Sequence, residues 1–238
     1  NIRQGNSLIS GTEEELKGYF GDDWEEKKPF NWERKFPDIM KDGGFHVVIG
    51  NPPYVQVSMD TKLEPCLKEY LITAFGSSLG RLNTFGFFIH RGISLLKQGG
   101  FLGFIIPNTF LTQEYYRGLR KFILDNCQIF AIATLEEMPF EAAVVENVVI
   151  ILRKENSVQT REQNQVLITE LGKGKEHRIP QSVFENTFNY SFVVYLSTKL
   201  ETFKEKIDAQ STNLGRLVNV NQAIALKHDR NSCLFKEA

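Results

Sequence analysis

The consecutive residues Asn51-Pro52-Pro53-Tyr54 carry groups that could activate an amine whose lone pair is delocalised into a ring or a carbonyl. The Asn51 side-chain oxygen and the Pro52 carbonyl can accept both N–H groups of one amine and draw it toward tetrahedral geometry. The lone pair then points away from them, toward an electrophile such as a methyl donor. Proline restricts its own backbone and that of the preceding residue, so the acceptors are in place before the substrate arrives. The Tyr54 ring offers a stacking face for a planar base.

The position of this tetrapeptide in the chain favours a binding site, although Asn-Pro is also a common start of a rigid turn. It directly follows the apolar run Phe45–Gly50. Such a run is typical of a buried parallel strand, and open α/β sheets bind ligands beyond the carboxyl ends of these strands.

The spacing of apolar residues predicts the elements that would position the tetrapeptide. Strands are expected at residues 45–49, 101–106, 129–135 and 144–152. One helix is expected at 84–98, ended by Gly99-Gly100, and another at 112–126, capped by Thr112. The last two strands have no helix between them, which suits an antiparallel pair. The expected fold is α/β, with a twisted, mostly parallel sheet that has one antiparallel strand.

The composition becomes polar after Lys154. Short strands are expected at 166–171 and 192–196, and a helix at 200–209. Between the two strands, Gly172-Lys173-Gly174-Lys175 is predicted to be a hairpin turn, because it lacks the spacing and the Ser or Thr of a phosphate-binding loop.

Several segments resemble, in the same order, the motifs of amino-group DNA methyltransferases. The similarity is greatest to the N6-adenine enzymes of bacterial restriction–modification systems, especially the large type II proteins that fuse methylation and cleavage. The similar segments are 36–39, 43–55 with the tetrapeptide, 81–85, 99–111, Phe140 and 145–152. The resemblance implies a partial Rossmann-like sheet that uses S-adenosyl-L-methionine as methyl donor.

The resemblance also implies catalytic and base-binding residues. Asn51 and Pro52 would grip the amino group of an adenine that is flipped out of duplex DNA, while Tyr54 stacks on the base. Phe140, the aromatic residue of a later loop, would pack against the base from another side.

The residues expected to contact the methyl donor are Asn6, Asn51 and Phe85. Asn6 lies where the family often has a carboxylate that binds the adenine amine of the donor. An amide oxygen also accepts this hydrogen bond, though more weakly than an ionised acceptor. Phe85 would line the methionine side. His46 replaces an Asp found in many relatives, but it lies within the strand and leaves the catalytic assignment standing.

The glycine-rich turn with which this family binds the donor is absent from the sequence. We therefore expect residues 1–154 to be the catalytic half of a methyltransferase domain, without its cofactor-binding N-terminal part. Residues 155–210 would be a connecting segment, and 211–238 the start of a target-recognition domain. In this interpretation the chain belongs to a longer parent protein, has little activity alone and meets double-stranded DNA through that parent.

The composition limits the remaining possibilities. The formal net charge of -1 over 238 residues lacks the basic excess of a typical nucleic-acid binder. The basic clusters around Arg120 and Arg178 are interpreted as solvated faces. No apolar run approaches the roughly 20 residues of a membrane span, so a cytoplasmic location is expected. Cys66, Cys127 and Cys233 are expected to be free thiols, and no residue spacing predicts a metal site.

Two other functions stay open. Enzymes that methylate a glutamine side chain of a release factor, or a guanine of ribosomal RNA, use the same tetrapeptide or close variants because they activate the same kind of amine. The chain could also be a non-catalytic DNA-specificity or interaction module that keeps the loop as a scaffold. The block 101–111 and the apparent start of a recognition domain near Leu214 favour DNA adenine.

Overall fold

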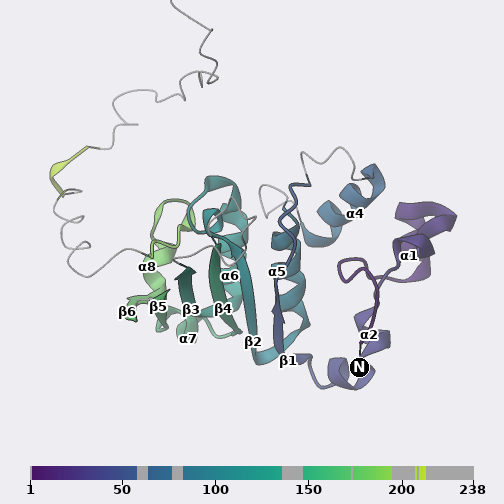
Figure 1. Cartoon of the computed structure of the whole chain (residues 1–238), viewed down its shortest axis with the longest axis horizontal. Helices are drawn as coiled ribbons and strands as arrows, with labels where there is room; N and C mark the ends of the chain where they lie inside the picture. The colour runs from purple at the N-terminus through teal and green to yellow at the C-terminus, as the bar shows by residue number, and fades with distance from the viewer. Residues whose placement is uncertain are drawn as a thin grey trace, which may run out of the picture. The chain divides into compact units, whose positions relative to one another are not determined.

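A mixed sheet of six strands, in the order β1-β2-β4-β3-β5-β6, forms the core of the structure (Figure 1). The computed structural model describes residues 2–57, 64–76, 83–135, 147–172, 174–194, 207 and 209–212. The strands are β1 (Phe45–Gly50), β2 (Leu96–Pro107), β3 (Cys127–Leu135), β4 (Asn147–Lys154), β5 (Gln165–Leu171) and β6 (Lys175–Pro180). Asn1–Tyr195 forms one unit and Leu196–Ala238 another, and in the second unit the expected helix at 200–209 lies largely outside the described residues.

The helices connect the strands and flank the sheet. The α-helices are α1 (Glu13–Phe20), α2 (Trp32–Lys35), α3 (Pro37–Lys41), α4 (Pro65–Phe75), α5 (Thr84–Leu95), α6 (Arg117–Asn126), α7 (Val158–Glu162) and α8 (Gln181–Glu185). The 3-10 helices are η1 (Gly21–Lys27), η3 (Asn108–Leu111), η4 (Glu114–Tyr116) and η5 (Phe188–Tyr190).

The strand directions confirm the expected α/β class and the reversed strand. β1 is parallel to β2, and β3 is parallel to β5. β4 lies between β2 and β3 and is antiparallel to both. A second reversed strand, β6, pairs with β5 across the hairpin at Gly172 and Gly174, both of which have positive φ. Residues after 154, which we expected to be a connecting segment, add the strands β5 and β6 to the same sheet.

The position of the strand after β5 was predicted wrongly. It was expected at 192–196, but it lies at Lys175–Pro180, where the sequence looks like a basic turn. β6 is an edge strand, and Ile179 is buried while His177 and Arg178 are exposed. A strand at the edge of a sheet needs few buried side chains, so its apolar signal is weak. Phe192–Val194 is not a strand.

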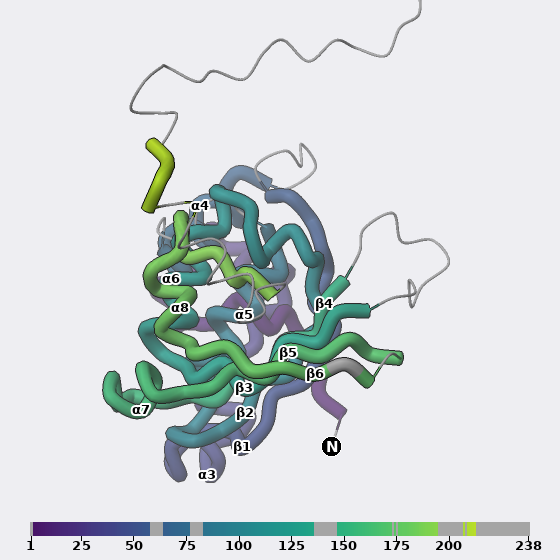
Figure 2. Tube along the Cα trace, turned by 90° about the vertical axis from the view of Figure 1, so that its left-hand side faces the viewer, coloured from purple at the N-terminus to yellow at the C-terminus, as the bar shows by residue number. Residues whose placement is uncertain are grey.

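The helices α5, α6 and α8 gather on one side of the sheet (Figure 2). The opposite side carries large apolar side chains that are partly exposed. Val47 is 59% exposed and Ile49 is 84% exposed, and Phe130 on β3 is 52% exposed. We expected β1 to be a buried strand. This was wrong for one of its faces, because β1 is the edge strand among the described residues.

The boundary between α5 and β2 lies earlier than predicted. The helix was expected to reach residue 98 and stop at two glycines, but it ends at Leu95, and those glycines lie inside β2. Gly99 has a φ of 77°, and a Cβ on Gly100 would lie 2.8 Å from the Phe45 carbonyl oxygen. The glycines therefore allow a close approach of two backbones where the β1–β2 register shifts.

The start of α6 was also predicted wrongly, although its end at Asn126 is correct. Thr112 ends the short helix η3 and does not cap α6, which begins at Arg117. Pro107 and the two 3-10 turns after it hold the backbone out of the α-helix until residue 117.

Arg120 corrects the expectation that its basic cluster is a solvated face. The side chain is 0% exposed, and its guanidinium donates to the carbonyls of Phe110 (2.6 Å), Gln113 (2.9 Å), Asn189 (2.8 Å) and Tyr190 (3.0 Å). Burial lowers the pKa of Arg120 to about 10, so the group remains charged at neutral pH. Arg120 thus joins the turn after β2 to the segment that follows α8.

Candidate active site

The loop Asn51–Tyr54 leaves the carboxyl end of β1 and is fastened to the start of α5. The Thr84 hydroxyl donates to the Pro53 carbonyl and accepts from the Val55 N–H at 3.0 Å. The Thr84 N–H donates to the Val55 carbonyl at 2.9 Å. The Asn83 side chain accepts from the N–H of Phe85 and caps α5. The loop is therefore held by hydrogen bonds to the first turn of α5, where the backbone N–H groups have no partner within the helix.

Tyr54 links the loop to β2 and to Asn51. Its hydroxyl lies 3.1 Å from the Ile105 carbonyl oxygen and 3.2 Å from the Asn51 side-chain oxygen. Burial raises the pKa of Tyr54, so the hydroxyl keeps its single proton at neutral pH. It can donate to only one of the two acceptors at a time. When it donates to Ile105, the Asn51 oxygen is available to a substrate amine.

Phe85 lies behind Tyr54. It is fully buried, and its ring meets the Tyr54 ring edge-on, with 6.3 Å between the centroids. Phe110 and Tyr116 enclose it from the other sides. In this position Phe85 packs against the Tyr54 ring. The expected contact of Phe85 with the methyl donor stays a prediction.

A cavity of about 320 Å³ lies against the loop. Its lining is mostly apolar and includes Ser7, Trp32, Asn51, Pro52 and Arg91. Asn51 is exposed, whereas Pro52 is buried. Within the described part of the chain, the Nε of Arg91 is buried without a hydrogen-bond partner. This cavity therefore has space beside Asn51, and one of its lining residues, Arg91, is cationic.

Asn6 lies near this cavity, through its neighbour Ser7, but its side chain is turned into the local backbone. The Asn6 side-chain oxygen accepts from the Leu8 N–H at 3.2 Å, and its backbone forms a bridge with Pro29. Of the three residues expected to contact the methyl donor, only Asn51 lines the cavity. The role expected for Asn6 stays a prediction.

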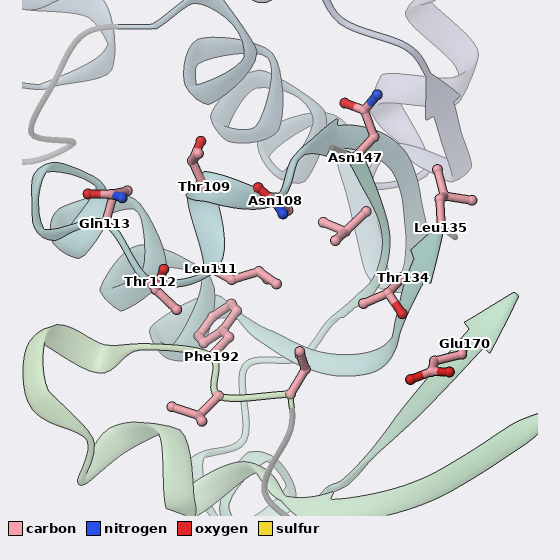
Figure 3. A pocket seen from close by; sticks show the side chains of 13 residues that line it. Asn108, Thr109, Leu111, Thr112, Gln113, Thr134, Leu135, Asn147, Glu170 and Phe192 are labelled. Carbon is pink, nitrogen blue, oxygen red and sulfur yellow. The ribbon is translucent and has the colours of Figure 1, made fainter. Parts of the chain in front are cut away.

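A larger cavity, of about 430 Å³, opens beyond β2 at the same edge of the sheet (Figure 3). Asn108, Thr134, Asn147 and Glu170 surround it. Phe140, the expected second aromatic residue of the base site, lies outside the described residues. Sequence reasoning missed Asn147. The signal that could have found it is an amide residue directly before the apolar run Val148–Leu152.

The remaining reactive groups are placed in the core or on the surface. The described cysteines, Cys66 and Cys127, are free, and burial raises the pKa of Cys127 to about 12. The His90 ring stacks on the Phe122 ring, with 4.4 Å between the centroids. Across the described residues, no group of three or more His, Cys, Asp or Glu side chains could hold a metal ion. No helix in the same part of the chain is long and apolar enough to span a membrane.

Comparisons with known proteins give partial matches to large restriction–modification enzymes. A Methanocaldococcus jannaschii protein, RM.MjaORFECS2P, assigned as a type II restriction enzyme and methyltransferase, is 37% identical over 133 residues, which cover 56% of this chain and 11% of that protein. The type II restriction enzyme and methyltransferase RM.Eco57I of Escherichia coli is 27% identical over 157 residues, covering 66% of this chain and 14% of the relative. The chain thus spans about a seventh or less of these relatives.

Similarity to solved structures is also partial. The type IIG restriction endonuclease BpuSI superimposes with a TM-score of 0.49 and 20% identity, over 64% of this chain and 21% of that one. The family described as Eco57I restriction-modification methylase matches residues 3–140, which include the tetrapeptide at the end of β1. This match covers more than half of the sequence, and the chain belongs to the Eco57I restriction-modification methylase family.

Proposed function

We propose that this chain is the catalytic part of a site-specific DNA methyltransferase. It transfers a methyl group from S-adenosyl-L-methionine to N6 of an adenine that is flipped out of the duplex. The single observation that carries the proposal is the fixed loop Asn51–Tyr54, at the carboxyl end of β1 and beside a cavity that includes Asn51. Family membership and the restriction–modification relatives support DNA as the substrate.

Each loop residue makes a different contact with the target adenine. Asn51 accepts one N–H through its side-chain oxygen, and the Pro52 carbonyl accepts the other. With both protons held, the nitrogen lone pair is directed away from the loop toward the electrophile. The Tyr54 ring stacks on the flipped base and offsets part of the cost of extruding it, which is a few kcal/mol. Phe85 supports that ring from behind.

Tyr54 also has a positioning role. In the structure the Asn51 side-chain oxygen lies 3.2 Å from the Tyr54 hydroxyl. If the Asn51 amide turns over on substrate binding, its nitrogen donates to the Tyr54 oxygen while the hydroxyl donates to the Ile105 carbonyl, 3.1 Å away. That arrangement turns the Asn51 oxygen toward the substrate. A raised pKa keeps the Tyr54 hydroxyl protonated, so this orientation holds across neutral pH.

The residues present fit one end of the methyl donor. S-adenosyl-L-methionine, when bound, supplies an electrophilic methyl group. The donor would occupy the cavity that Asn51 lines, and the cationic side chain of Arg91, another lining residue, would suit the carboxylate at the amino-acid end of the donor. Ser7 and Trp32 would exclude water from the same space.

The test uses the protein that carries this chain, tritium-labelled S-adenosyl-L-methionine and unmethylated duplex DNA. Tritium should appear in N6-methyladenine after digestion to nucleosides. Asn51→Ala should lower kcat by about a hundredfold or more, the size of effect seen when one preorganised group for developing charge is lost. Asn186→Ala serves as the matched control, because Asn186 is an exposed amide at the end of α8.

Label in glutamine of a release factor or in ribosomal guanine, with none in DNA adenine, would transfer the assignment to those amine methyltransferases. Unchanged DNA methylation by Asn51→Ala and Tyr54→Ala would leave the loop as the scaffold of a non-catalytic module.

A further inference from the structure

The cavity of about 430 Å³ is separate from the catalytic loop, although both lie at one edge of the sheet. Its walls are η3 after β2, the facing ends of β3 and β4, and the segment Phe192–Val194. None of the residues Asn51–Tyr54 lines it. The Phe192 N–H donates to the Leu111 carbonyl at 2.8 Å, so two of the walls are joined. The cavity has the size of a small-molecule site, for which about 300–1,000 Å³ is usual.

Asn147 gives this cavity a binding group. The residue is only 3% exposed, and neither its side-chain oxygen nor its side-chain nitrogen has a hydrogen-bond partner among the described residues. Buried amides are normally paired, and leaving both atoms unpaired is costly. An amide presents an acceptor and a donor side by side. A ligand whose edge carries the complementary donor and acceptor would satisfy both atoms together.

The charge of the lining narrows the class of ligand. Among the described residues, no Lys or Arg lines the cavity, and the polar side chains there are amides and hydroxyls together with the carboxyl of Glu170. A phosphate would find no counter-charge there. A nucleobase is neutral and planar, and its edge is a row of donors and acceptors. The N6–H and N7 of adenine match an Asn amide, whereas guanine presents two acceptors on the same edge.

We propose that this cavity is a second nucleobase site, an inference that rests on the proposed function. The site holds an unpaired adenine of the DNA substrate, different from the target adenine. The Asn147 side-chain amide forms hydrogen bonds with the edge of this second base. The target adenine gives both amino protons to Asn51 and Pro52, so it cannot also donate to Asn147. One strand separates β1 from β4, which places the two asparagines at least about 10 Å apart at the usual spacing of strands. One DNA molecule can reach both sites.

The experiment titrates 2′-deoxyadenosine into the whole chain, labelled with ¹⁵N and carrying Asn51→Ala so that the target site is disabled. The Asn147 side-chain amide signal should shift on binding. Adding Asn147→Leu should weaken binding at least about tenfold, the lower range of discrimination from one bidentate pair. Asn147→Asp, which replaces the donor by an acceptor, should weaken it to a similar extent. Asn186→Leu, at an exposed amide outside the cavity, should leave it unchanged.

Two further arms identify the source of the base. Deoxyguanosine should bind at least about tenfold more weakly than deoxyadenosine. A short single-stranded oligonucleotide with one adenine should compete for the site, and S-adenosylhomocysteine should not. The proposal is overturned if neither asparagine variant weakens deoxyadenosine binding, if no binding is seen, or if only S-adenosylhomocysteine competes, since that result assigns the cavity to the methyl donor. None of these outcomes bears on methylation through Asn51, so the proposed function is tested separately.

Discussion

Replacing Arg120 by lysine should destabilise this chain strongly, because the guanidinium holds four backbone carbonyls at once. Its donors point in fixed directions to the carbonyls of Phe110, Gln113, Asn189 and Tyr190. A lysine ammonium donates from a single point and is more strongly hydrated, so it cannot reach all four and resists burial.

The magnitude follows from the number of carbonyls that lose their partner. If lysine keeps two of the four contacts, two buried acceptors are left unpaired, at about 1–3 kcal/mol each. The free energy of unfolding should then fall by about 2–6 kcal/mol. For a chain of this length each kcal/mol lowers the melting temperature by roughly 2–4 °C, so the melting temperature should fall by roughly 4–24 °C.

The assay is unfolding of the whole chain by heat and by urea, followed by circular dichroism. Arg3→Lys is the matched control, because Arg3 is exposed and the same change there should alter the free energy of unfolding by less than about 0.5 kcal/mol. A loss below about 1 kcal/mol for Arg120→Lys would refute the reasoning, since it would mean that the carbonyls find other partners at little cost. Arg120 joins η3 to the segment that leads to Phe192, and these form two of the walls of the larger cavity, so deoxyadenosine binding should weaken as well.

Three further predictions concern the site and its surroundings. Tyr54→Phe in the protein that carries this chain should lower kcat about threefold to tenfold and leave KM for DNA nearly unchanged, because the ring remains and one orienting hydrogen bond is lost; a change confined to KM would contradict the positioning role. Asn147→Leu should raise the free energy of unfolding by about 1–3 kcal/mol in urea titrations, because it removes an unpaired buried amide; a decrease would mean that the amide is paired. Burial lowers the pKa of His90 below its usual 6.5, so the folded state favours the neutral ring. Stability should therefore fall as the pH drops from about 7 to 5, and His90→Gln should reduce this fall when melting is measured across that range.

The sequence was sufficient for features that depend on local apolar patterning. The runs that became β1, β2, β3 and β4 consist of residues that favour strands, and the short link before β4 correctly indicated a reversed strand. The tetrapeptide was placed correctly at the carboxyl end of β1. These features need only the identity of neighbouring residues and the rule that parallel strands require long crossovers.

The errors arose where distant residues decide the structure. Gly99 and Gly100 look like a helix stop, yet their function is a close approach to β1, which is far away in sequence. Arg120 looks like a surface charge until the carbonyls of Asn189 and Tyr190 are brought to it. Asn147 gains its importance from burial by segments that precede and follow it. No pattern within one element contains this information.

The central position of β4 has a consequence for the order in which the chain can fold. β2 and β3 are connected through α6, but they do not pair with each other, because β4 lies between them. Before residues 147–154 are synthesised, one edge of β2 therefore has no partner, and β3 has no partner on either edge, because β5 also follows in the sequence. Such edges pair readily with other chains. Residues 147–154 are therefore needed to join β2 to β3 in one sheet. A chain whose synthesis stops before these residues should be prone to aggregation.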